Sequence, residues 1–134
     1  RKLFMTGNYI TDIDQLSTLT QLERLSLSNN HINDIGAIAG LTNLRYMAID
    51  RNAITDITAL SRMTWLGTLR MDYNHIVDIT IVSRLINLRY IGISNNMIVD
   101  GSPMSHLTSI TYMNVKNNPY LGDRVANMTK LQSL

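Results

Sequence analysis

The 134-residue chain has no cysteine, which excludes disulfide bonds and thiolate chemistry. Its formal net charge is only +2, and its basic residues form no run, so we do not expect nucleic-acid binding. No apolar stretch approaches the length of a membrane span, so we expect no membrane insertion. The sequence begins with Arg1 and Lys2 rather than a signal peptide, and we expect any targeting segment to lie outside it.

Signatures of catalysis are also missing. The sequence has no glycine-rich phosphate loop and no nucleophile motif. His31 and His75 occupy one repeat position two repeats apart, a separation of roughly 10 Å by strand spacing, which is too far to share a zinc ion. His106 is isolated. We therefore expect no enzyme activity, no cofactor, no metal site and no small-molecule substrate.

What the chain does have is a repeat of 22 residues. Asparagine recurs at this step six times: Asn8, Asn30, Asn52, Asn74, Asn96 and Asn118. Five residues before each asparagine, an apolar column keeps the same step: Leu3, Leu25, Met47, Leu69, Ile91 and Met113. Two residues after it stands another: Ile10, Ile32, Ile54, Ile76, Ile98 and Tyr120. Chance does not align several columns at one period.

The pattern inside one repeat predicts its secondary structure. Residues 25–28 alternate apolar and polar, as in a strand with one buried face. Ile35, Ile38 and Leu41 then follow three residues apart, a step that suits a 3₁₀ turn better than an α-helix. The sequence therefore predicts an α/β repeat solenoid, with a parallel sheet on the concave face and 3₁₀ or short helical turns on the convex face.

Two polar columns have structural explanations. A buried unpaired polar group costs roughly 1–3 kcal/mol, and an asparagine amide, which donates and accepts, can satisfy the backbone of its own turn and of the neighbouring turn. We therefore interpret the six asparagines as a structural ladder. The carboxylates that start each helical return are interpreted as N-caps; they are Asp12, Asp34, Asp56, Asp78 and Asp100.

At this point a family resemblance is specific. Residues 22–35 read Leu-x-x-Leu-x-Leu-x-x-Asn-x-Ile-x-Asp-Ile, which resembles the 22-residue leucine-rich repeats of bacterial internalins. The phosphatase-regulator class of leucine-rich repeats is also similar. The match covers nearly the whole chain and departs at Gly101, where other repeats have isoleucine. The internalin resemblance implies a right-handed coil that binds other proteins. It also implies that the chain belongs to a secreted or bacterial cell-surface protein, whereas the regulator resemblance implies a cytoplasmic location.

The expected domain organisation is a single leucine-rich-repeat domain over residues 1–134, with about six repeats. Neither end shows the polar cap that solenoids need, so we interpret the segment as a fragment of a longer array. The alternative is a short closing helix through Val125, Met128, Leu131 and Leu134.

The strand positions that should face solvent vary from repeat to repeat. They lie six, four and two residues before each asparagine, and four of the eight aromatic side chains fall there: Phe4, Tyr46, Tyr90 and Tyr112. Tyrosine and arginine are enriched at interface hot spots, although tyrosine is also simply a good strand residue. The residues that we predict to bind a protein partner are Arg24, Tyr46, Asp50, Arg70, Asp72, Tyr90, Tyr112 and Lys116.

Three side chains allow more than one interpretation. Asp50 and Asp72 could suggest an acid–base pair or a cation site, but we expect two solvated carboxylates beside Arg51 and Arg70. Trp65 stands where other repeats have Asn, Gln or Ser. It is either an exposed anchor on the return side or a cover for a neighbouring loop, and the sequence does not choose.

The predicted function is protein–protein interaction, as adhesion or recognition of a partner through the concave sheet face. An intracellular regulatory or scaffold subunit and a structural spacer in a larger surface protein are the alternatives.

Overall fold

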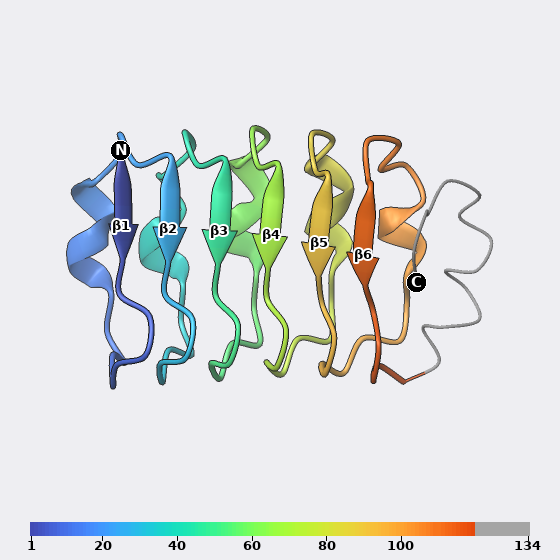
Figure 1. The fold of residues 1–134 in the computed structure, drawn as a ribbon, viewed down its shortest axis with the longest axis horizontal. Helices are drawn as coiled ribbons and strands as arrows, with labels where there is room; N and C mark the ends of the chain where they lie inside the picture. The colour runs from blue at the N-terminus through green and yellow to red at the C-terminus, as the bar shows by residue number, and fades with distance from the viewer. Residues whose placement is uncertain (120–134) are drawn as a thin grey trace.

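The structure, a computed structural model, describes residues 1–119. It contains a six-stranded sheet in which every neighbouring pair is parallel and the strands follow the order of the chain. Figure 1 shows the six arrows side by side and pointing the same way. The strands are β1 (Lys2–Phe4), β2 (Arg24–Ser26), β3 (Tyr46–Ala48), β4 (Thr68–Arg70), β5 (Tyr90–Gly92) and β6 (Tyr112–Asn114).

Each strand returns to the next through a short 3₁₀ helix on the other side of the coil (Figure 1). The helices are η1 (Asp14–Thr18), η2 (Gly36–Ile38), η3 (Thr58–Arg62), η4 (Thr80–Arg84) and η5 (Ser102–Met104). Parallel strands with 3₁₀ returns confirm the fold predicted from the repeat. The alternative closing helix at Val125, Met128, Leu131 and Leu134 lies outside the described residues, as does Tyr120.

The repeat period is the strand register. Each residue pairs with the residue 22 positions later, as Leu25 does with Met47 and Leu69 does with Ile91. The central residue of each strand therefore stacks on its equivalent, and from β2 to β5 these residues are fully buried. The returns supply the opposite wall of the core, with one buried residue in each helix: Leu16, Ile38, Leu60, Val82 and Met104.

The asparagine ladder joins consecutive turns. Asn74 Nδ2 donates to Met71 O of its own turn at 3.2 Å and to Ile49 O of the preceding repeat at 3.0 Å. Its Oδ1 accepts from Ile54 N at 3.1 Å. The same three bonds recur, with lengths within a few tenths of an ångström, at Asn30, Asn52, Asn96 and Asn118.

The residue before each ladder asparagine has a left-handed backbone. Position 7 is glycine, with φ of 74°, and positions 29, 95 and 117 are asparagine, which tolerates this conformation well. Arg51 and Tyr73 adopt it too, with φ of 54° and 56°. Left-handed backbone costs a residue with a long side chain roughly 1–2 kcal/mol, so these two residues occupy an unfavourable place in the turn.

The aspartate column differs from the prediction by one position. Asp34 Oδ1 accepts from Gly36 N at 2.7 Å, and Asp56 Oδ1 accepts from Thr58 N at 2.8 Å. The N-cap residue of each helix is the isoleucine that follows the aspartate, Ile35 in η2 and Ile57 in η3, and it makes no side-chain capping bond. The carboxylates therefore form Asx turns that lead into each helix. The bonds from Thr58 lower the pKa of Asp56, and those from Thr80 lower the pKa of Asp78.

Candidate functional site

The face of the sheet is less exposed than strand alternation predicts. Of the eighteen positions expected to face solvent, six are buried: Ser26, Ala48, Asp50, Asp72, Gly92 and Ser94. Their side chains are short, and they lie in the middle of the face among larger neighbours. The prediction that Asp50 and Asp72 are solvated carboxylates is therefore wrong.

Asp50 is 7% exposed and has three polar partners. Its Oδ1 accepts from Asp72 N at 3.2 Å, and its Oδ2 accepts from Ser28 Oγ at 3.0 Å. Arg70 Nε lies 3.4 Å from Asp50 Oδ2. Burial raises the pKa of Asp50, while the charge of Arg70 opposes that shift. The same ion pair raises the pKa of Arg70, which is charged at any physiological pH.

Asp72 continues this chain of contacts into the next two repeats. Its Oδ1 accepts from Ser94 N at 2.7 Å, from Ser94 Oγ at 2.5 Å and from Asn114 Nδ2 at 3.4 Å. The carboxylate lies so close to Gly92 that an added Cβ would overlap its Oδ2 and meet its Cγ at 3.1 Å. Glycine at position 92 thus makes room for Asp72. Both carboxylates are held by donors from the protein itself.

Aromatic and cationic side chains surround these buried acids. The rings of Tyr90 and Tyr112 stack with centroids 4.6 Å apart and planes 9° from parallel, as expected for neighbours on adjacent strands. The guanidinium of Arg24 lies 4.9 Å from the ring centroid of Tyr46. Burial raises the pKa of Tyr90, so its hydroxyl stays neutral and able to donate.

Arg51 and Tyr73 belong to the same surface, although the strand columns did not point to them. The guanidinium of Arg51 lies 4.1 Å from the ring centroid of Tyr73. Both residues line a hollow of about 350 Å³ at the end of the strands, together with Arg70, Tyr90, Asn95 and Lys116. A sequence signal was available: these are the long side chains in a column that otherwise holds glycine or asparagine.

The structure brings most of the predicted binding residues together. Asp50, Arg70, Asp72, Tyr90 and Lys116 line this hollow, with Tyr112 stacked on Tyr90. Arg24 and Tyr46 form a pair of their own on β2 and β3. We call the members of this set that are exposed or half-buried, together with Arg51 and Tyr73, the concave patch: Arg24, Tyr46, Arg51, Arg70, Tyr73, Tyr90, Tyr112 and Lys116.

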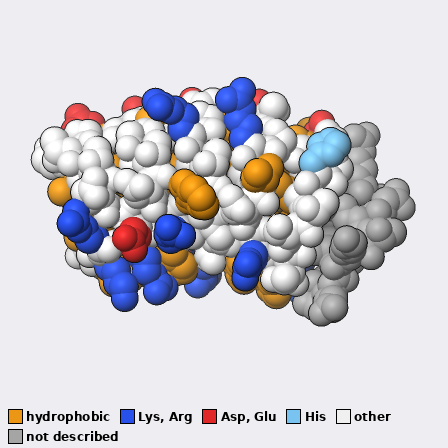
Figure 2. Space-filling view, turned by 90° about the horizontal axis from the view of Figure 1, so that it is seen from above, with side chains coloured by type: hydrophobic (Ala, Val, Ile, Leu, Met, Phe, Trp, Pro, Cys, Tyr) orange, Lys and Arg blue, Asp and Glu red, His pale blue; other side chains and the backbone are white. Residues whose placement is uncertain are grey.

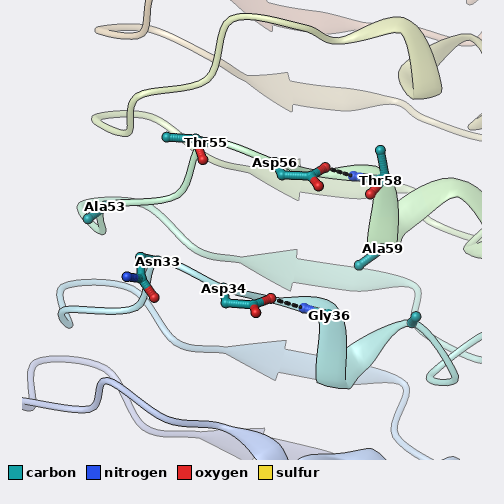
Figure 3. Close-up of a pocket in the computed structure, with 9 residues that line it drawn as sticks. Asn33, Asp34, Gly36, Ala53, Thr55, Asp56, Thr58 and Ala59 are labelled. Carbon is teal, nitrogen blue, oxygen red and sulfur yellow. Dashed lines mark hydrogen bonds between the residues drawn. The ribbon is translucent and has the colours of Figure 1, made fainter.

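A larger groove of about 890 Å³ lies elsewhere, between the second and third repeats. Its walls are short side chains, including Gly36, Ala53 and Ala59. Figure 3 shows the carboxylates of Asp34 and Asp56 bonded to the start of their own helices. The groove is therefore wide because its lining is small, and its carboxylates already have backbone partners.

Two observations concern metals and membranes. Within residues 1–119, no three His, Asp or Glu side chains come close enough to hold a metal ion. No helix in this part of the chain has the length and apolar character needed to cross a membrane.

Trp65 is exposed rather than covering a loop. It is 59% exposed, and its ring centroid lies 5.7 Å from the guanidinium of Arg45. It lies in the turn that precedes β4, at the edge of the sheet rather than on its face. The choice that the sequence left open between an exposed residue and a cover is settled in favour of exposure.

Comparison with known proteins agrees with this geometry. Residues 1–40 and 20–62 match the family described as Leucine Rich repeats (2 copies). The structure resembles an internalin (inlF) from Listeria monocytogenes strain 4b F2365, with a TM-score of 0.87 and 32% identity over 97% of this chain. It also resembles internalin C2 (inlC2) of the same strain, with a TM-score of 0.75 and 37% identity over 81% of this chain.

The chain spans only part of these relatives. It covers 38% of the inlF chain and 46% of the inlC2 chain. No curated protein sequence matches it. The similarity therefore covers less than half of the length of each Listeria chain.

Proposed function

Because this chain is an internalin-like leucine-rich-repeat solenoid, we propose that it is a protein-interaction module that recognises a partner protein through the concave patch. The observation that carries the proposal is that Arg51 and Tyr73 occupy the left-handed position of the turn, which otherwise holds glycine or asparagine. They make the turn less stable than asparagine or glycine would, and their side chains line the hollow beside Arg70 and Tyr90.

Preorganisation supports the same function. The stacked rings of Tyr90 and Tyr112 and the Arg24–Tyr46 pair hold aromatic side chains in place before any partner arrives. Side chains that are already ordered lose less conformational entropy on binding. Tyrosine and arginine are also the side chains that dominate interface hot spots.

The charge of the patch indicates the kind of partner. Its exposed charged members are all cationic, namely Arg24, Arg51, Arg70 and Lys116, while the two acids beside them are buried. A partner with acidic groups around an apolar contact fits this surface, because complementary charge steers association and fixes orientation. The concave patch is therefore aromatic and basic, and it lies above two buried acids.

Size limits what the strand face does alone. Six strands about 4.8 Å apart give a face of roughly 29 Å by roughly 16 Å, or about 450 Å². A standard interface takes about 800 Å² from each partner. Surfaces outside the strands must therefore add to the contact, as Arg51 and Tyr73 do.

We further propose that the module belongs to a secreted or bacterial surface protein and acts in adhesion or recognition. The support is its likeness to two Listeria internalins. Such a protein would meet its partner outside the cell that makes it.

A comparative pull-down tests the proposal. The wild-type chain, a Tyr46/Tyr90/Tyr112→Ala variant and a Tyr73→Asn variant are immobilised and exposed to surface-protein extracts of candidate host cells. We expect a partner that the wild type retains and both variants lose. Asn at position 73 matches the residue at positions 29, 95 and 117, so this variant keeps the turn that the fold needs.

Tyr9→Ala is the matched control, because Tyr9 is 87% exposed and lies outside the concave patch. It should retain the partner. Recovery of the same proteins by all four chains would overturn the proposal and favour a spacer.

A further inference from the structure

The edge of the sheet where the strands begin carries two exposed apolar side chains. Trp65 is 59% exposed and Ile86 is 60% exposed, and they lie in the turns before β4 and β5. Figure 2 looks onto this edge and shows hydrophobic side chains near its middle, with Lys or Arg on either side. This surface is separate from the concave patch, because Trp65 and Ile86 precede their strands, whereas the patch lies on the strands and on the turns that follow them.

Both residues depart from the repeat in a way that the fold does not require. Asn43 and Asn87 occupy the column of Trp65, and their Nδ2 atoms donate to Thr20 O at 2.9 Å and Thr64 O at 2.8 Å. At position 65, an indole replaces the amide that links the turns of Asn43 and Asn87 to the turns before them. Ile86 likewise stands where the other four turns have threonine: Thr20, Thr42, Thr64 and Thr108. Two neighbouring turns have thus exchanged polar side chains for exposed apolar ones.

The surroundings of the pair are basic. Arg45, Arg62, Arg84 and Arg89 are all exposed. Arg45 lies against the ring of Trp65. Arg62 and Arg84 end the helices that lead into the two turns. We call these four arginines with Trp65 and Ile86 the basic edge.

Acidic side chains near the basic edge are few and already engaged. Glu23, in the column of Arg45, has its carboxylate 3.7 Å from the ammonium group of Arg1. Asp56 and Asp78, at the far ends of η3 and η4, are bonded to Thr58 N and Thr80 N. The arginines around Trp65 and Ile86 therefore present net positive charge to solvent.

We propose that the basic edge is a second docking site, which binds an acidic segment of a protein. An apolar side chain of that segment would pack on Trp65 and Ile86, and its carboxylates would pair with the flanking arginines. Tryptophan and arginine are the strongest anchors at protein interfaces. Binding to a membrane scales with buried apolar area, and two apolar side chains supply little of it, so the observations favour a protein segment over a lipid surface.

The single tryptophan of the chain makes the proposal testable at one position. The full chain is titrated with a synthetic peptide that repeats the triplet Glu-Glu-Leu, and tryptophan fluorescence is recorded. We expect a saturable change in fluorescence. The affinity obtained from it should fall at least fivefold between 50 mM and 500 mM salt, because salt screens exposed charge pairs. A peptide with lysine in place of glutamate should give no saturable change.

Variants that restore the repeat keep the test independent of folding. Ile86→Thr restores the threonine of the other turns and keeps Trp65 as the reporter. It should lower the affinity for the acidic peptide at least threefold. Binding to the Trp65→Asn variant is followed by fluorescence anisotropy of a labelled peptide. This substitution should lower the affinity for the acidic peptide at least tenfold. The control is Met97→Ala, an apolar side chain that is 53% exposed and lies beyond β5; it should leave the affinity unchanged.

Three outcomes overturn the proposal. The first is no saturable change with the acidic peptide, and the second is an equal affinity for the lysine peptide. The third is a fluorescence change with phosphatidylserine vesicles but not with the peptide, which would make the edge a lipid-binding surface. Tyr90→Ala should leave the peptide affinity unchanged, so this result and the pull-down on the concave patch fail or succeed separately.

Discussion

The turns after the strands and the face of the sheet both use polar side chains to connect neighbouring repeats. In the turns, the connections made by the ladder recur: Asn52, Asn74 and Asn96 each bond one turn to the next with the same three hydrogen bonds. On the face, one backbone bond recurs, because Oδ1 of Asp50 accepts from Asp72 N as Oδ1 of Asp72 accepts from Ser94 N. The side-chain contacts of the two carboxylates occur once each, since Asp50 contacts Ser28 and Arg70, and Asp72 contacts Ser94 and Asn114. The bonds that repeat hold the coil together, and those that occur once shape a particular surface.

The largest expected effect is in the recurring set. Asn74→Ala removes three donated bonds and one accepted bond from a side chain that is 5% exposed. Each buried group left unpaired costs about 1–3 kcal/mol, so we expect a loss of about 3–5 kcal/mol in the free energy of unfolding. Urea denaturation followed by circular dichroism measures it.

Asn8→Ala is the matched control for this prediction. Asn8 is exposed and donates only within its own turn, to Met5 O and Thr6 O. Its loss should cost less than about 1 kcal/mol. Equal losses at positions 8 and 74 would show that the bond between turns is not what stabilises the coil.

The next effect concerns the set that occurs once. Gly92→Ala places a Cβ against the Asp72 carboxylate, which must move away from Ser94 and Asn114. Overpacking of this kind costs about 1–3 kcal/mol. Asp72→Ser, which introduces the serine found in that column at positions 28 and 94, should remove most of the penalty in the double variant. A double-mutant cycle measured by urea denaturation tests this; additive losses would contradict it.

The smallest effect separates a carboxylate of the face from one that leads into a helical return, by the sign of its pH dependence. Burial raises the pKa of Asp50 above its ordinary value of 3.8. In the window from 3.8 up to that raised value, native Asp50 binds a proton that the unfolded chain has released, so its contribution to stability falls as pH rises. The lowered pKa of Asp78 has the opposite consequence: its contribution is present above the ordinary pKa and is lost as pH falls through the native pKa.

Urea midpoints of the wild type, Asp50→Asn and Asp78→Asn between pH 2.5 and 6 measure these slopes. The advantage of the wild type over Asp50→Asn should shrink as pH rises above 3.8, and its advantage over Asp78→Asn should shrink as pH falls below 3.8. Slopes of the same sign for both variants would contradict the assignment.

The fold could be predicted because it is periodic. A single turn has too few residues to define its structure, but the columns of Leu25 and Asn30, repeated six times, leave only one register. Pairing of Tyr90 with Tyr112 followed from that register. The predicted N-cap lay one residue too early, at Asp34 rather than Ile35. Sequence spacing does not distinguish an N-cap from an Asx turn that precedes it.

The surface was harder to predict, because it depends on contacts between non-equivalent side chains. Alternation along a strand places Asp50 and Asp72 on the outer face, but it does not reveal that donors on neighbouring strands enclose them. Arg51 and Tyr73 lie outside the strand columns, so strand alternation did not predict them; their backbone conformation and mutual stacking place them on this surface. Exposure of Trp65 required the coordinates as well.

The run of contacts from Ser28 through Asp50 and Asp72 to Asn114 has a consequence for recombination between repeats. If only the recurring bonds joined the repeats, any 22-residue repeat could replace another. The contacts from Ser28 to Asn114, however, connect the repeats of β2 to β6 through side chains that differ between repeats. A single repeat exchanged within that span would separate a carboxylate from its donors. New specificities should therefore arise more readily by transfer of residues 28–114 as one block than by shuffling individual units.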